Sequence, residues 1–112
     1  MIYNALITFT TVSAISLTDP TAGITNWPGG TAEAWRIFIQ PLRGNAGAMY
    51  VGDKNVTNNG TSYAIAELAA PTTATPLDSF LVVAPKDRGM DPGEYYVHGA
   101  NGQKCKATVW SM

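Results

Sequence analysis

The sequence predicts an all-β fold: a single-domain β-sandwich or small barrel, jelly-roll-like or immunoglobulin-like, of about six to eight short antiparallel strands with no long helix. Three observations lead to this prediction. Apolar residues alternate with period two in several short runs. Nowhere do apolar residues recur at three-four spacing over three turns without an interruption. A length of 112 residues matches the commonest size of one domain.

The N-terminal segment predicts a long, half-buried strand over residues 7–17. Ile7, Phe9, Ile15 and Leu17 share one face of this strand. Proline and glycine in residues 19–32 then predict a connection. We therefore expect one β domain over 1–112, in which residues 1–32 form an extended arm or edge strand plus a loop that packs on neighbouring chains.

The middle of the chain predicts three further strands. Residues 35–40 carry apolar side chains on both faces, as expected if one face meets a partner or a second sheet, and Pro41 ends this strand. A short strand follows over 49–51, and residues 63–68 are a candidate for the next. The prolines of residues 69–76 favour an extended connection with little charge.

The C-terminal part predicts a strand over 77–84, a solvated loop over 85–93 and two last strands over 94–98 and 104–110. Between the last two strands lies Asn101-Gly102, and Asn-Gly is the strongest short-range hairpin signal because both residues tolerate positive φ. We therefore expect the C-terminus to form a hairpin.

Charge and composition suggest a component of an assembly. Only 13% of the residues are charged, 46% are hydrophobic, and the net charge is -1. An ordinary soluble domain has about 25% charged residues, so much of this small surface must be uncharged and suited to burial against other chains. A nearly neutral chain gives no electrostatic reason to expect nucleic acid or anionic lipid as a partner.

Candidate catalytic and metal-binding residues are few, so we expect no enzyme and no cofactor. His98 and Cys105 are the single residues of their types, and no third group at a recognisable spacing would orient them as a catalytic pair. Two such residues cannot form a zinc site. Asp53 and Asn55 belong to an oxygen-rich loop, but turn formation explains them more simply than calcium does.

Aromatic residues leave a carbohydrate-binding function open. Flat aromatic faces with polar neighbours suit sugar rings, although the same residues are common in cores and at subunit interfaces. Trp27, in a Pro-Gly-Gly loop, is the one we expect to be exposed. The candidates are Trp27, Trp35, Tyr95, Tyr96 and Trp110.

Two stretches resemble a known group of proteins. Residues 49–60 read Tyr-Val-Gly, an Asp/Lys/Asn step, Val-Thr and Asn-Gly, and residues 95–104 contain Tyr-Val, Gly, Asn-Gly and Gln-Lys. Together they are similar to small β-rich virion proteins of tailed bacteriophages, over roughly residues 48–110. The resemblance implies a capsid decoration or cement protein on the capsid exterior, made in the host cytoplasm, that binds between major capsid protein subunits and often trimerises.

The alternatives are a carbohydrate- or receptor-binding module of a virion, which would bind a host surface glycan, and a tail or neck component. For the decoration function, we expect the N-terminal third to face neighbouring chains and the loop over 86–91 to face solvent, because residues 1–32 contain one charged residue, Asp19. The expected interface residues are Ile7, Phe9, Trp27, Pro28, Trp35, Pro71 and Pro76.

Overall fold

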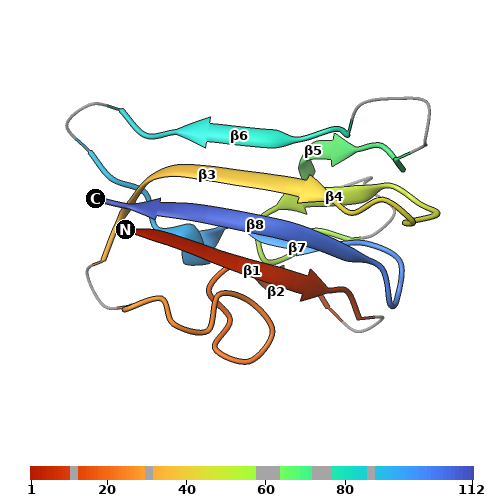
Figure 1. Ribbon diagram of the computed structural model, residues 1–112, viewed down its shortest axis with the longest axis horizontal. Helices are drawn as coiled ribbons and strands as arrows, with labels where there is room; N and C mark the ends of the chain where they lie inside the picture. The colour runs from red at the N-terminus through yellow and green to blue at the C-terminus, as the bar shows by residue number, and fades with distance from the viewer. Residues whose placement is uncertain (11–12, 30–31, 58–63, 72–76, 86–87) are drawn as a thin grey trace.

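Eight strands form two four-stranded antiparallel sheets in the part of the chain that the computed structural model describes, which is residues 1–112 without 11–12, 30–31, 58–63, 72–76 and 86–87. The front sheet in Figure 1 has the order β1 (Ile2–Thr8), β8 (Lys104–Ser111), β3 (Ala34–Pro41) and β6 (Phe80–Val83). The back sheet has the order β2 (Ile15–Ser16), β7 (Tyr96–His98), β4 (Met49–Gly52) and β5 (Ala64–Leu68).

The order of the strands is that of a jelly roll. At each of the four positions, the front strand and the back strand are consecutive in the chain: β1 with β2, β8 with β7, β3 with β4, and β6 with β5. This pairing of positions is the double Greek key of jelly rolls, and it decides between the two sandwich types that the sequence left open. The all-β sandwich prediction is therefore confirmed.

The core lies between the inner faces of the two sheets. Strand residues alternate between this core and the surface, as the period-two pattern predicts. Burial of these apolar side chains is the main contribution to folding stability. The largest fully buried side chains include Phe9, Ile7, Leu17, Ile24, Ile37, Ile39, Met49, Val51, Val97 and Val109.

The long strand that we predicted over residues 7–17 is two strands in different sheets. β1 ends at Thr8 in the front sheet, and β2 begins at Ile15 in the back sheet. Phe9 and Leu17, at the two ends of this segment, are nevertheless both buried. Both sheets face the same core, so a chain that crosses from one to the other can bury apolar residues on either side of the crossing.

The predicted C-terminal hairpin is also corrected. β7 pairs with β2 and β4, whereas β8 pairs with β1 and β3, so these consecutive strands lie in different sheets. The turn itself is present: the N–H of Gln103 donates to the carbonyl of Ala100 (3.0 Å), and Gly102 has φ of 83°. The asparagine-glycine signal thus marks a turn between sheets.

The two crossings between the sheets lie side by side. The N–H of Phe9 donates to the carbonyl of Gln103 (2.8 Å), and the N–H of Gly102 donates to the carbonyl of Phe9 (3.0 Å). A Cβ at Gly99 would lie 2.5 Å from the Phe9 ring, so the close approach requires a glycine there. Phe9 therefore holds the crossing after β1 against the crossing before β8.

Most other strands appear where the sequence predicts them. β3, β4, β5, β6 and β8 fall within or close to the expected ranges, and Pro41 is the last residue of β3. Before β7, residues Pro92–Glu94 form a short 3-10 helix, η1, where we expected the strand to begin at residue 94. The expected solvated loop includes Lys86 and Asp87, which lie outside the described residues; Arg88 and Asp91 are exposed.

Candidate functional site

The outer side of the front sheet exposes large apolar side chains from strands that are far apart in the sequence. Across the sheet, Ile2 is opposite Trp110, Trp110 is opposite Arg36, and Arg36 is opposite Val83. The next positions place Asn4, Thr108, Phe38 and Leu81 in a second row. We call this outer side the front face: Ile2, Asn4, Leu6, Trp35, Arg36, Phe38, Gln40, Leu81, Val83, Lys104, Lys106, Thr108 and Trp110.

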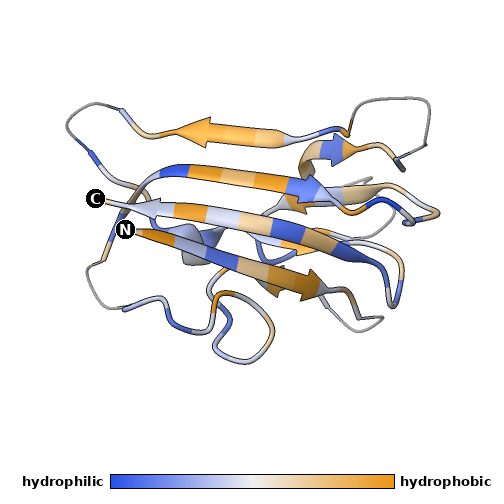
Figure 2. Cartoon of the chain, in the orientation of Figure 1, coloured by the Kyte–Doolittle hydropathy of each residue, from blue (hydrophilic) through white to orange (hydrophobic). Residues whose placement is uncertain are grey.

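Exposure of apolar side chains is strongly one-sided. Among the described strands, the exposed large hydrophobic residues of the front sheet are Ile2, Leu6, Trp35, Leu81 and Val83. The back sheet contributes one, Ile65. Figure 2 shows alternation of hydrophobic and hydrophilic residues along β1, β3 and β8, whereas β6 is hydrophobic throughout. Exposed apolar groups gathered on one face are typical of a surface that binds another macromolecule.

A bulge in β3 places two consecutive side chains on the front face. The register between β3 and β8 shifts between Ala34 and Arg36, so Trp35 is an extra residue. The Trp35 ring lies 6.3 Å from that of Trp110, centroid to centroid. The Arg36 guanidinium carbon lies 4.4 Å from the centroid of the Trp110 ring, within the range of a cation–π contact. The bulge therefore builds an aromatic and cationic cluster at one end of this face.

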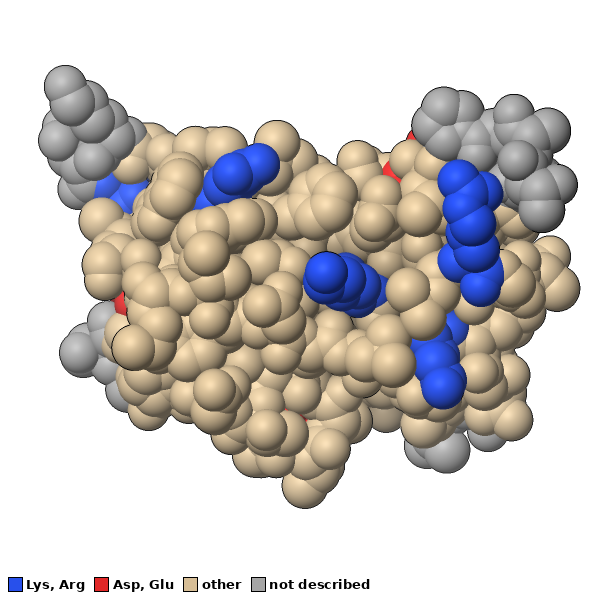
Figure 3. Space-filling view, viewed as in Figure 1, with Lys and Arg blue, Asp and Glu red and all other residues tan. Residues whose placement is uncertain are grey.

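The charges on the front face are all positive. The four front strands carry Arg36, Lys104 and Lys106 and no acidic residue. Figure 3, seen from this side, shows a largely neutral surface with scattered basic side chains, and acidic side chains are visible only at its margins. A partner surface that combines apolar groups with carboxylates would complement this face.

The residues that we predicted for an interface separate into two groups. Ile7 and Phe9 are 0% and 1% exposed, so they belong to this chain's own core and cannot contact a neighbour. The surface of β1 is its other side, which carries Ile2 and Leu6. Trp35 is exposed and lies on the front face. The expectation for Ile7 and Phe9 is corrected because period-two alternation does not say which side of a strand faces inward.

The remaining predicted residues lie elsewhere. Trp27 is half-buried and makes an edge-to-face contact with Tyr3 at 5.0 Å, so its ring is less exposed than we expected. Pro28 beside it is exposed, and Pro71 is half-buried. Pro76 lies outside the described residues. The structure thus brings Trp35 together with front-face residues that we did not predict for an interface. Apolar residues on both sides of β3 and β6 were the sequence pattern that could have indicated them.

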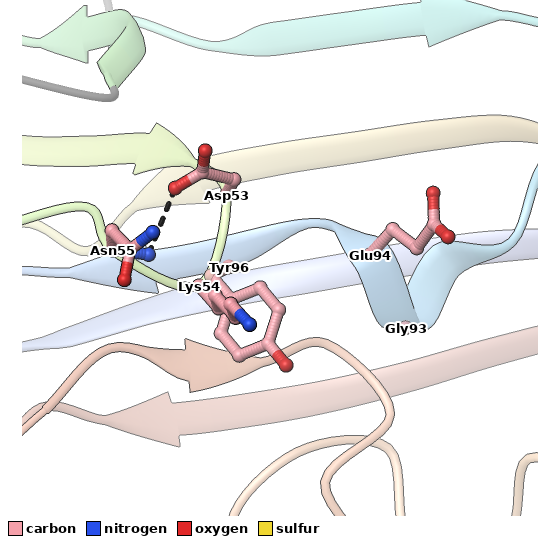
Figure 4. A pocket seen from close by; sticks show the side chains of 6 residues that line it. All are labelled: Asp53, Lys54, Asn55, Gly93, Glu94 and Tyr96. Carbon is pink, nitrogen blue, oxygen red and sulfur yellow. Dashed lines mark hydrogen bonds between the residues drawn. The ribbon is translucent and has the colours of Figure 1, made fainter.

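A shallow pocket of about 330 Å³ lies on the back-sheet side (Figure 4). Its lining combines the ring of Tyr96 with Asp53, Lys54, Asn55 and Glu94, and with Gly93. Asp53 accepts a hydrogen bond from the backbone N–H of Asn55 (2.8 Å), which closes a turn at the mouth of the pocket. In Figure 4 the Glu94 side chain points away from Asp53 and Asn55. An aromatic ring with separated polar groups fits a polar ligand better than it fits a catalytic pair.

His98 and Cys105 lie in different sheets. The Nε2 of His98 lies 3.2 Å from the carbonyl oxygen of Thr10; because a carbonyl only accepts, Nε2 carries the proton in this contact. The Nδ1 of His98 is buried without a hydrogen-bond partner in the structure. Cys105 is fully buried in β8 among core residues, and burial raises the pKa of its thiol to about 12. This thiol stays protonated at neutral pH, so the geometry offers no thiolate to a partner.

The described residues contain neither a cluster of metal ligands nor a membrane-spanning helix. Within the described ranges, histidine, cysteine and acidic side chains do not gather in groups of three or more. No helix among the same residues is long and apolar enough to span a lipid bilayer.

Comparisons with protein-family models, with characterised proteins and with solved structures give no match to this chain. Its function is therefore inferred from the two faces of the sandwich.

Proposed function

We propose that this chain is a structural protein of a bacteriophage virion, a capsid decoration protein that binds between major capsid subunits through its front face. The observation that carries the proposal is the front face itself, with exposed apolar residues from β1, β3 and β6, three basic residues and no acidic one on its four strands. The resemblance of residues 49–60 and 95–104 to small virion proteins of tailed phages points in the same direction.

Interface burial would be the physical work of such a protein. Ile2, Leu6 and Val83 are each a little more than half exposed, so covering each one contributes on the order of 1 kcal/mol at about 25 cal/mol per Å². Arg36, Lys104 and Lys106 would set the orientation by meeting carboxylates of the capsid, since charge complementarity gives specificity more than affinity. Repeated over a capsid lattice, such contacts reinforce the shell without chemistry.

The proposal predicts that a charge placed on the front face abolishes capsid binding. Leu6 is 57% exposed, so Leu6→Glu should fold normally while it places a buried carboxylate in the interface. We expect purified wild-type protein to cosediment saturably with heads of the encoding phage prepared from a strain that lacks this gene. Leu6→Glu should bind at least about tenfold more weakly, a loss of roughly 1.4 kcal/mol.

Ile65→Glu is the matched control. Ile65 is 63% exposed on β5 of the back sheet, so the same change is made on a strand of the opposite face. This variant should bind heads as wild type does. The proposal is wrong if wild-type protein does not bind heads, or if the two variants weaken binding equally.

A glycan-binding function is the second candidate, and the pocket around Tyr96 favours it. Jelly rolls occur in lectins as well as in viral capsid proteins, so the fold is compatible with both functions. Under this alternative, a glycan array gives a saturable signal that Tyr96→Ala removes, because Tyr96 supplies an aromatic ring to the lining of this pocket. Leu6→Glu should leave that signal unchanged.

A further inference from the structure

β6 is an edge strand: among the described residues, no strand pairs with its outer side. It ends the front sheet on the side of β3 and consists of Phe80, Leu81, Val82 and Val83 (Figure 1). Natural edge strands are commonly protected by a lysine, a proline or a bulge. None of these interrupts β6, and its register with β3 is regular over all four residues.

The hydrogen-bonding groups at this edge can be assigned from the register. The N–H of Ala84 donates to the carbonyl of Trp35 (2.9 Å), so this pair is hydrogen-bonded. Hydrogen-bonded pairs alternate along an antiparallel ladder, which makes Val82 with Ile37 and Phe80 with Ile39 the next such pairs. The backbone groups of Leu81 and Val83 consequently point away from β3, toward the open side of the sheet.

The core is also incompletely covered at this edge. Ile37 and Ile39 on the neighbouring strand are 0% exposed, whereas Phe80 and Val82, which face inward from β6, are both partly exposed. Across the core, β5 contributes the small residues Ala64 and Ala66, which are also partly exposed. One more strand beside β6 would cover these inward side chains.

The opposite edge of the front sheet differs. There, the segment that carries Trp27 packs on β1 through the contact between Trp27 and Tyr3. Covering an edge with a loop is one of the ways in which proteins prevent strand addition. Of the two edges of the front sheet, β6 is therefore the better candidate for pairing.

We propose that β6 pairs with β6 of a second copy of this chain, in antiparallel orientation about a twofold axis at Val82. In this arrangement Leu81 of each copy exchanges backbone hydrogen bonds with Val83 of the other, and the two front sheets join into one. The edge is self-complementary because all four residues of β6 are apolar. Across the joined sheet, Arg36 of one copy lies in the same cross-strand row as Phe38 of the other. The two arginines therefore do not face each other. The resemblance implies a trimer; this edge fits a dimer.

Sedimentation velocity of the full chain over a concentration series tests the proposal without any capsid. We expect a concentration-dependent dimer. Val83→Pro removes an N–H that points out of the sheet, and proline is tolerated at such edge positions, so this variant should keep the wild-type circular dichroism spectrum. Each dimer of this variant loses two intermolecular hydrogen bonds. Its self-association should therefore be at least about tenfold weaker than that of the wild type.

A cross-link tests the register. Opposed residues that are not hydrogen-bonded have Cα atoms about 4.5 Å apart, which a disulfide can bridge. Val82→Cys should therefore form a disulfide-linked dimer under mild oxidation. Ile65→Cys, an equally new thiol on the other sheet, should not, and Cys105 is buried and takes no part.

Three results would overturn the proposal. Wild-type protein that remains a monomer at every concentration would show that β6 does not bind a second copy, whether or not it binds a strand of another protein. A dimer that Val83→Pro leaves intact, or that Val82→Cys fails to link, would place the contact elsewhere. If Val83→Pro does not fold, Leu81→Lys replaces it, since a lysine on an edge also prevents pairing.

Discussion

Cys105 shows how one buried residue makes stability depend on pH. Burial raises the pKa of its thiol from 9.0 to about 12, because the thiolate would lose its hydration in the core. Above pH 9 the thiol of the unfolded chain releases its proton while that of the folded chain keeps it. The unfolded state then binds fewer protons, so the free energy of unfolding falls as pH rises from 9 toward 12.

This predicts a difference between wild-type protein and Cys105→Ala in alkaline solution. Between pH 7 and pH 10 the wild type should lose about 1.4 kcal/mol more of its free energy of unfolding than the variant does. Urea unfolding at several pH values measures it. The variant also loses packing, but that loss is constant with pH, so parallel curves for the two proteins would contradict the prediction.

At the scale of single residues, the sequence predicts which side chains share one side of a strand, but not what that side contacts. The sequence shows that Ile7 and Phe9 share a side of their strand, and both are indeed on one side, in the core. It does not show whether that side meets the second sheet or another chain. Apolar residues are equally suited to both, so our assignment of these two residues to an interface could be corrected only by the structure.

At the scale of elements, Phe9 is decisive because it lies where the chain leaves β1 for the back sheet. Its ring is 1% exposed beside Gly99, and its backbone is bonded to the turn before β8. Phe9→Ala should therefore lower the free energy of unfolding by about 3–5 kcal/mol. Leu6→Ala, three residues earlier on the exposed side of β1, should cost less than about 1 kcal/mol. Chemical denaturation measures the free energy of unfolding of both variants. Similar losses for the two would contradict the buried position of the Phe9 ring.

Strand positions were predictable because turn residues and period-two runs are local signals, as β3 and β4 show. Membership of a sheet is not local. Ile7 and Phe9 around the end of β1 and Ile15 and Leu17 around β2 are all buried, although the chain changes sheets between them. A turn that joins two sheets and a turn that joins two paired strands use the same residues, so the predicted hairpin could not be distinguished from the crossing that forms.

At the scale of the whole molecule, the two broad surfaces of the sandwich differ in polarity. The front face is apolar and basic, whereas the back-sheet side carries the polar pocket around Tyr96. Four strands about 4.8 Å apart and seven residues of about 3.3 Å give the front face a projected area on the order of 400 Å². A stable interface buries about 800 Å² per partner. A pair of copies joined at β6 would present twice the area, which would bring the face into that range.

The low charge of the chain predicted that some surface would be buried, and the structure shows where the exposed apolar groups gather. It could not be read from the sequence that Ile2, Trp110 and Val83 lie in one row, because they come from three strands separated by up to 108 residues. Of the predicted interface residues that the structure describes, only Trp35 lies on that face.

The position of β8 sets the order in which the molecule can be completed during synthesis. β8 lies between β1 and β3, yet it is the last of the described strands to leave the ribosome. Until then β1 has no partner strand, and the front sheet consists of the single pair β3 and β6. Contacts between residues this far apart in the chain form slowly. This domain therefore cannot finish folding before β8 has been synthesised, and a nascent chain halted before residue 104 lacks the strand that pairs with β1.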